Sequence, residues 1–132
     1  LTLVNSESGV FKIKVKAIIL ANGCRERTSK HINIHGTRPS GIYTAGTAQY
    51  FINIQGYMPF KKCVILGSGD IGLIMARRLS LEGADVLGVY EAKDSPSGLT
   101  RNINQCLEDF NIPLHLSKTV TRVFGDDKLE RV

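Results

Sequence analysis

Three glycines at close spacing are the residues of this chain best suited to chemistry. In "CVILGSGDIGLIMARRLSLEGADVLGVYE" (63–91), Gly67, Gly69 and Gly72 end an apolar run and open a helical pattern. Gly67 lets the chain leave a strand in a tight turn, and Gly69 keeps the backbone open to a pyrophosphate. Gly72 lets the helix lie close on the strand. We therefore expect a diphosphate at the start of this helix, where unpaired N–H groups and the helix dipole favour anions.

An acid at the end of the following strand completes this pattern. Glu91 stands where a carboxylate binds the hydroxyls of an adenosine ribose, and its charge repels a 2′-phosphate, which favours NAD over NADP. Lys93 is interpreted as a solvated loop residue, with a compensating charge as the alternative. Asp70, at the helix start, is expected to cap backbone N–H groups. The predicted cofactor-binding residues of this stretch are Gly67, Ser68, Gly69, Asp70, Ile71, Gly72 and Glu91.

Alternating strands and helices are needed to position these residues. Apolar periodicity predicts strands at 63–66, 85–91 and 112–116, with helices at 70–82 and 99–110 between them. This order predicts an α/β fold with a Rossmann-like βαβαβ parallel sheet and right-handed crossovers. A hairpin around "GDD" is expected to follow. In the first helix we expect Ile71, Ile74, Met75 and Leu79 on the buried stripe, Ala76 on a small-residue face, and Gly83 at the C-terminal cap.

The first half of the chain has weaker patterns. A hairpin is predicted from 1–5 and 10–16, followed by a strand at "AIILA" (17–21) buried on both faces. No strong period appears from 25 to 59, apart from a short helix at 48–54, and this stretch is interpreted as a connection between two domains. Because the chain lacks an initiator Met and stops within a strand pattern, we expect it to be an interior piece of a longer protein.

Composition excludes several kinds of partner. The net charge of +5 comes from 17 Lys and Arg against 12 Asp and Glu, and these cations are dispersed, which argues against nucleic acid. "FKIKVK" (11–16) is interpreted as a strand with one solvated face, with a phosphate-binding ribbon as the alternative. No apolar run is long enough to span a membrane. His31 and His35 share a face but are too few to predict a metal site.

The cysteines indicate a reduced, cytoplasmic protein. Their number is odd and no CxxC pair occurs, so neither zinc nor a dithiol redox motif is predicted. Cys63 and Cys106 lie in apolar patterns and are interpreted as small core residues. Cys24 has no general base near it in sequence. His115 is expected on the exposed face of its strand.

"KAIILANG" (16–23), followed by an irregular link and "VILGSGDIGLIMARRLSLEGADVLGVYE", resembles the flavoproteins of the pyridine nucleotide-disulfide oxidoreductase family. In that family an NAD(P)H domain is inserted into an FAD domain. The resemblance implies a partial FAD-binding domain at 1–35, a connection at 36–60 and an NAD-binding domain at 61–132. It also implies that Ala21, Asn22 and Gly23 run beside the FAD, with Asn22 in place of the usual Thr. Ile74 stands where family members often carry a Glu.

The sequence thus favours a fragment of an FAD-dependent oxidoreductase that binds NAD(H). In the full protein, NADH would exchange a hydride with FAD, and the fragment alone is expected to be inactive. No side chain stands out as a general acid or base. A Rossmann-type S-adenosylmethionine-dependent methyltransferase and a non-catalytic dinucleotide-binding module are the alternatives. A homodimer or an electron-transfer partner of the full protein is left open.

Overall fold

A three-stranded parallel sheet lies at the centre of the fold. In the computed structural model, which describes every residue from 1 to 132, its strands are β4 (Lys62–Leu66), β5 (Asp85–Tyr90) and β6 (Leu114–His115), in the order β4-β5-β6. Helix α2 (Asp70–Leu81) connects β4 to β5. Helix α3 (Thr100–Cys106) and a 3-10 turn, η1 (Glu108–Phe110), connect β5 to β6. The predicted α/β fold and its βαβαβ order are confirmed.

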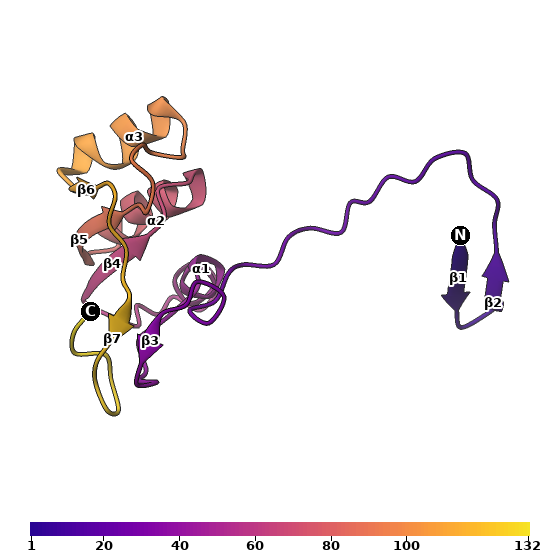
Figure 1. The fold of residues 1–132 in the computed structure, drawn as a ribbon, viewed down its shortest axis with the longest axis horizontal. Helices are drawn as coiled ribbons and strands as arrows, with labels where there is room; N and C mark the ends of the chain where they lie inside the picture. Colours follow the sequence, from indigo (N-terminus) through magenta and orange to yellow (C-terminus); the bar gives the residue numbers. More distant parts are fainter.

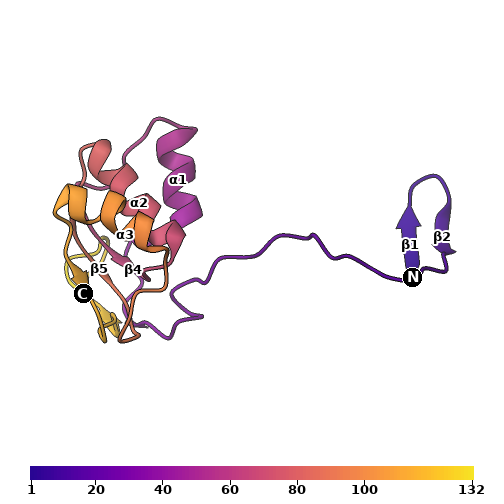
Figure 2. The same cartoon turned by 90° about the horizontal axis from the view of Figure 1, so that it is seen from above.

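Three helices form a layer beside the sheet (Figure 2). Helix α2 packs on β4 and β5, with α1 (Ala45–Asn53) and α3 on either side of it. Helix α1, which was predicted at 48–54, begins where the Thr44 side chain accepts a hydrogen bond from the Thr47 amide. Helix α2 ends as predicted, because Gly83 takes the left-handed conformation (φ +88°) that a residue with a Cβ adopts only with strain.

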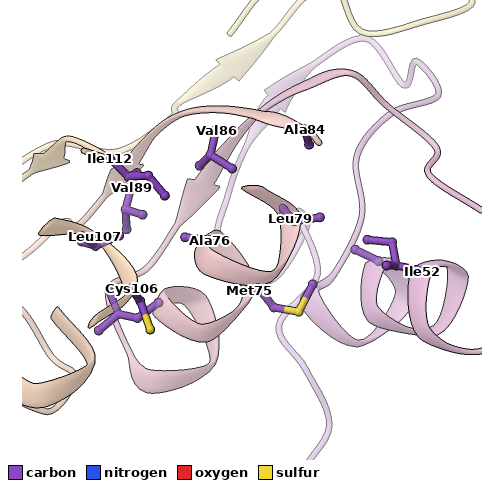
Figure 3. Close-up of a cluster of buried hydrophobic side chains, with 12 residues drawn as sticks. Ile52, Met75, Ala76, Leu79, Ala84, Val86, Val89, Cys106, Leu107 and Ile112 are labelled. Carbon is purple, nitrogen blue, oxygen red and sulfur yellow. The ribbon is translucent and has the colours of Figure 1, made fainter. Parts of the chain in front are cut away.

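The hydrophobic core fills the space between this layer and the sheet (Figure 3). Leu73 and Ala76 of α2 and Val89 of β5 are completely buried. Removing such side chains from water is the main favourable contribution to folding, at about 25 cal/mol per Å² of apolar surface. The twelve clustered residues are Ala48, Ile52, Leu73, Met75, Ala76, Leu79, Ala84, Val86, Val89, Cys106, Leu107 and Ile112.

The buried stripe of α2 differs from the prediction. Met75 and Leu79 are buried as expected, but Ile71 and Ile74 keep 65% and 47% of their surface exposed. Leu73 is buried in their place. Gly72 faces the end of β4, where a methyl group would collide with the Gly67 carbonyl oxygen and lie 3.6 Å from the Ile65 side chain, and the neighbouring Leu73 is the residue that enters the core.

An N-terminal arm extends away from the rest of the chain (Figures 1 and 2). It ends in an antiparallel hairpin of β1 (Thr2–Asn5) and β2 (Gly9–Lys12), which confirms that prediction. The predicted buried strand at 17–21 is wrong, since these residues form no strand and Ile19 is 92% exposed. A strand requires a neighbour that pairs its backbone, and no segment of this chain lies beside the arm. The total accessible surface of 9912 Å² exceeds the roughly 6,900 Å² expected for a compact monomer of this mass.

The C-terminal residues return to the stretch that precedes α1. Strand β7 (Arg122–Val123) pairs in parallel with β3 (His35–Gly36), a two-residue strand that periodicity did not predict. The predicted terminal hairpin is reduced to one antiparallel bridge between Phe124 and Arg131. No helix of the structure has both the length and the apolar character needed to cross a membrane.

Candidate functional site

The turn from β4 into α2, called the glycine bend here (Gly67–Gly72), has the backbone geometry that its glycines predicted. Gly67 has φ +99°, and its N–H donates to the carbonyl of Tyr90 at 2.7 Å, which ties the bend to β5. A methyl group at Gly72 would collide with the carbonyl oxygen of Gly67. One at Gly69 would meet no atom within 4 Å. The bend is therefore packed tightly on its inner side and open in front of Gly69.

Four consecutive amides at the start of α2 have no acceptor within the chain. The N–H groups of Gly69, Asp70, Ile71 and Gly72 donate no hydrogen bond, and the first intrahelical bond runs from Leu73 N to Gly69 O at 3.1 Å. They stand at the positive end of a twelve-residue helix. Unpaired amides combined with the helix dipole attract an anion, so the bend can hold a phosphate or diphosphate group.

Glu91 lies behind the bend and is hydrogen-bonded to it. Only 7% of the residue is exposed. Its Oε2 accepts bonds from the Ser68 hydroxyl (2.6 Å), the Ser68 amide (3.1 Å) and the Ser97 hydroxyl (3.1 Å). Its Oε1 accepts one bond, from the Lys93 amide (3.0 Å). These donors, the Ser68 hydroxyl first and the Lys93 amide second, stabilise the ionised form and lower the pKa of Glu91 to about 2, although burial opposes the shift.

This bonding limits how Glu91 can meet a ligand. Three donors already occupy Oε2, whereas Oε1 has one donor and retains acceptor capacity. Oε1 is therefore the oxygen that can accept a further hydrogen bond, such as one from a ribose hydroxyl, without displacing a serine. That Glu91 binds a ribose stays a prediction. The structure adds a second role, since Glu91 fixes the position of Ser68, which is fully buried.

Asp70 does not cap its own helix, and that part of the prediction is wrong. Gly69 is the N-cap of α2, and no side chain bonds there. The Oδ1 atom of Asp70 instead accepts bonds from the Leu99 amide (2.9 Å) and the Asn102 side-chain amide (2.8 Å). These two bonds, the first having the larger effect, lower the pKa of Asp70. The Asp70 carboxylate thus accepts hydrogen bonds at the start of α3, where α3 has no side-chain cap of its own.

The residues implied to run beside the FAD lie far from the glycine bend. Ala21, Asn22 and Gly23 are exposed and belong to the extended part of the arm (Figure 1). Nothing in the structure tests their contact with a flavin. The structure thus brings together the predicted residues from 67 to 72 with Glu91, and it does not bring these three to them.

The cysteines and histidines form no further site. Burial, together with the charge of Asp85, raises the pKa of the half-buried Cys63 to about 11. Burial also raises the pKa of Cys106, whereas Cys24 is exposed. His115 is not on an exposed face as predicted, because its ring stacks on Tyr90 with 4.7 Å between centroids.

Sequence reasoning missed the residues that join the bend to the β5–α3 loop. Ser97, Leu99 and Asn102 each donate to a carboxylate of the site. The available signal was "DSPSG" (94–98), a polar cluster followed by a glycine just before a helix. A methyl group at Gly98 would lie 2.8 Å from the carbonyl oxygen of Ser68, so this glycine also marks a close approach to the bend.

Comparisons with known proteins found one matching family model and several similar sequences. All of residues 1–132 match the family model described as pyridine nucleotide-disulphide oxidoreductase. An opine oxidase subunit from Agrobacterium tumefaciens is 31% identical over 64% of this chain. The hydrogen cyanide synthase subunit HcnB from Pseudomonas protegens is 33% identical over 70% of it. An NADH oxidase from Methanocaldococcus jannaschii is 27% identical over 98% of it.

The chain corresponds to only a small part of each of these relatives. The aligned segments span 16%, 19% and 30% of their respective lengths. Among solved structures, the thioredoxin reductase of T. acidophilum superposes with a TM-score of 0.47 at 24% identity. That superposition covers 66% of this chain and 26% of the reductase.

Proposed function

The chain belongs to the pyridine nucleotide-disulphide oxidoreductase family, and from this premise we propose that it is the NAD(H)-binding part of an FAD-dependent oxidoreductase. The observation that carries the proposal is the set of four unpaired amides from Gly69 to Gly72 behind an open glycine. In the full protein the bound nicotinamide supplies the hydride chemistry, in exchange with FAD. The relative named NADH oxidase supports this choice of nucleotide.

The residues of this chain bind and orient the nucleotide. The amides of Gly69, Asp70 and Ile71 hold the diphosphate, and the absence of a side chain at Gly69 gives it access. The free acceptor site on Glu91 Oε1 takes a hydroxyl of the adenosine ribose. Because this carboxylate is ionised at neutral pH, a 2′-phosphate beside it is disfavoured. The chain therefore selects NADH over NADPH.

The domain limits follow from the same proposal. Residues 61–132 are the NAD-binding domain, residues 36–60 are the connection, and residues 1–35 belong to the FAD-binding domain, with Ala21, Asn22 and Gly23 on the flavin side. The exposed arm supports this division, since its apolar residues Ile18, Ile19 and Leu20 have no partner in the chain. We place the full protein in the cytoplasm.

A nucleotide titration tests the proposal. NADH and NADPH are titrated calorimetrically into the chain and into Glu91→Gln, which keeps the shape of the side chain but removes its charge. We expect NADH to bind more tightly than NADPH, and the substitution to narrow this difference in binding free energy by about 1.5–3 kcal/mol, the value of a hydrogen bond to a charged group. Equal affinities in the wild-type chain would contradict the choice of NAD. Saturable binding of S-adenosylmethionine without binding of NADH would decide for a methyltransferase.

A further inference from the structure

The loop between β5 and α3 is fastened to the glycine bend at two points. This loop, called the clasp loop here (92–99), bonds to Ser68 through the amide of Ser97 (2.9 Å) and to Asp70 through the amide of Leu99 (2.9 Å). Between these bonds, Gly98 approaches so closely that a methyl group there would lie 3.1 Å from Asp70 Oδ1. The clasp loop thus packs against Ser68 and Asp70, whereas the space in front of Gly69 remains open.

Asp70 poses an electrostatic problem for a site that binds anions. The backbone amide of Asp70 is one of the four unpaired donors. The Asp70 side chain is therefore attached to the same backbone segment that would hold a diphosphate. A carboxylate and a phosphate a few ångströms apart repel each other strongly, even at the effective dielectric constant of about 20 that applies near a protein surface. A freely rotating Asp70 would therefore oppose the binding that the amides favour.

The structure shows how this charge is held. Both hydrogen bonds of the Asp70 side chain fall on Oδ1, from the Leu99 amide and from the Asn102 side chain, and both donors belong to the start of α3. Asn102 is itself only 8% exposed, so its amide group is fixed in place rather than mobile on the surface. The carboxylate is consequently directed toward α3 and the clasp loop.

We propose that Asn102 is a positioning residue for dinucleotide binding: together with the clasp loop, it keeps the Asp70 carboxylate turned toward α3, so that the unpaired amides of the glycine bend attract a diphosphate without opposition. The inference rests on the proposed function, because it assigns Asn102 a role in that same site. It adds a residue 30 positions beyond the glycine motif (102 − 72) that no dinucleotide-binding pattern in the sequence includes.

The test is a double-mutant cycle on Asn102→Ala and Asp70→Asn. NADH and inorganic pyrophosphate are titrated at low and high salt. We expect Asn102→Ala to weaken binding of both probes about fivefold at low salt, and less at high salt, because the freed charge is screened. In the Asp70→Asn background the same substitution should change affinity less than about twofold, since no charge is left to release. Gln105→Ala, an exposed amide of α3, is the matched control and should leave both affinities unchanged.

Each outcome decides the inference. A loss in Asn102→Ala that is independent of salt and persists with Asp70→Asn would show that Asn102 only shapes the loop, which overturns the proposal. If Asn102→Ala does not fold, Asp70→Asn alone decides: its pyrophosphate affinity should lie within about threefold of wild type, whereas a roughly tenfold gain would show that the carboxylate already faces the ligand. Binding of pyrophosphate without binding of NADH would contradict the proposed function. The pyrophosphate affinities of the same variants would then still decide whether Asn102 controls the Asp70 carboxylate.

Discussion

Replacing Gly72 by Ala tests the packing on which the glycine bend depends. The added methyl group collides with the carbonyl oxygen of Gly67, a backbone atom that cannot rotate away. Overpacking costs about 1–3 kcal/mol, and a collision with a backbone atom belongs at the upper end of that range, at about 2–3 kcal/mol. The higher helix propensity of Ala offsets about 1 kcal/mol of that. We therefore expect Gly72→Ala to lower the free energy of unfolding by about 1–2 kcal/mol.

Urea unfolding followed by circular dichroism measures this change. With a slope of about 2 kcal/mol per M, the middle of the usual range for urea, the midpoint should fall by about 0.5–1 M. Gly69→Ala is the matched control, because a methyl group there meets no atom within 4 Å and the residue has an ordinary φ of −66°. The urea midpoint of Gly69→Ala should fall less than that of Gly72→Ala. The affinity of Gly69→Ala for NADH should fall more than that of Gly72→Ala. A Gly72→Ala variant as stable as wild type would refute the argument that Gly72 packs against the Gly67 carbonyl with no space for a methyl group.

Two further predictions concern ionisable groups. Because the pKa of Glu91 is lowered from 4.5 to about 2 by folding, its stabilisation, at most about 3 kcal/mol, should be complete above pH 4.5 and lost as the pH falls toward 2. The difference in unfolding free energy between wild type and Glu91→Gln should shrink over that interval, and a constant difference would contradict the hydrogen-bonding account. Iodoacetamide at pH 8 should label Cys63 about 100-fold more slowly in the folded chain than in the urea-unfolded chain, since raising its pKa from 9.0 to about 11 lowers the thiolate fraction by that factor; the exposed Cys24 serves as the accessible reference thiol. Mass spectrometry after a timed quench shows whether Cys63 reacts as fast as Cys24, which would mean that it is not buried.

The sequence predicted the sheet and its helices because the signals for them are local. The apolar run before Gly67, the helical period after it and the glycine at position 83 are each readable within a few residues. Gly67 and Gly72 could be assigned their roles for the same reason, since a tight turn and a close helix–strand contact depend on the absence of one side chain.

The errors arise where an element depends on a distant partner. Residues 17–21 have the composition of a buried strand, but burial requires a second segment that this chain does not place there. Asp70 has the type and position of a helix cap, yet it bonds to Leu99 and Asn102, about thirty residues away. Neither relation has a period or a spacing that sequence patterns can report.

The glycine bend and Glu91 were predicted from the sequence, but the hydrogen bonds that connect them were not. The placement of Glu91 at the end of β5 follows from strand length, and the structure confirms it. Its four donors come from Ser68, Lys93 and Ser97, and only the fold decides which of the many polar groups in the β5–α3 loop reach it. The acid at position 70 was visible from the sequence, whereas the two donors that bond its carboxylate, the Leu99 amide and the Asn102 side chain, were not.

The extended arm changes how the size of this molecule is to be measured. The extended segment that follows β2 carries the β1–β2 hairpin well away from the body, so the particle has far more frictional drag than a sphere of 14.5 kDa. On a gel-filtration column calibrated with globular standards, a monomer will elute early, at the volume of a heavier protein. The oligomeric state of this chain should therefore be measured by light scattering or sedimentation equilibrium, because both methods give a molar mass that does not depend on the shape of the particle.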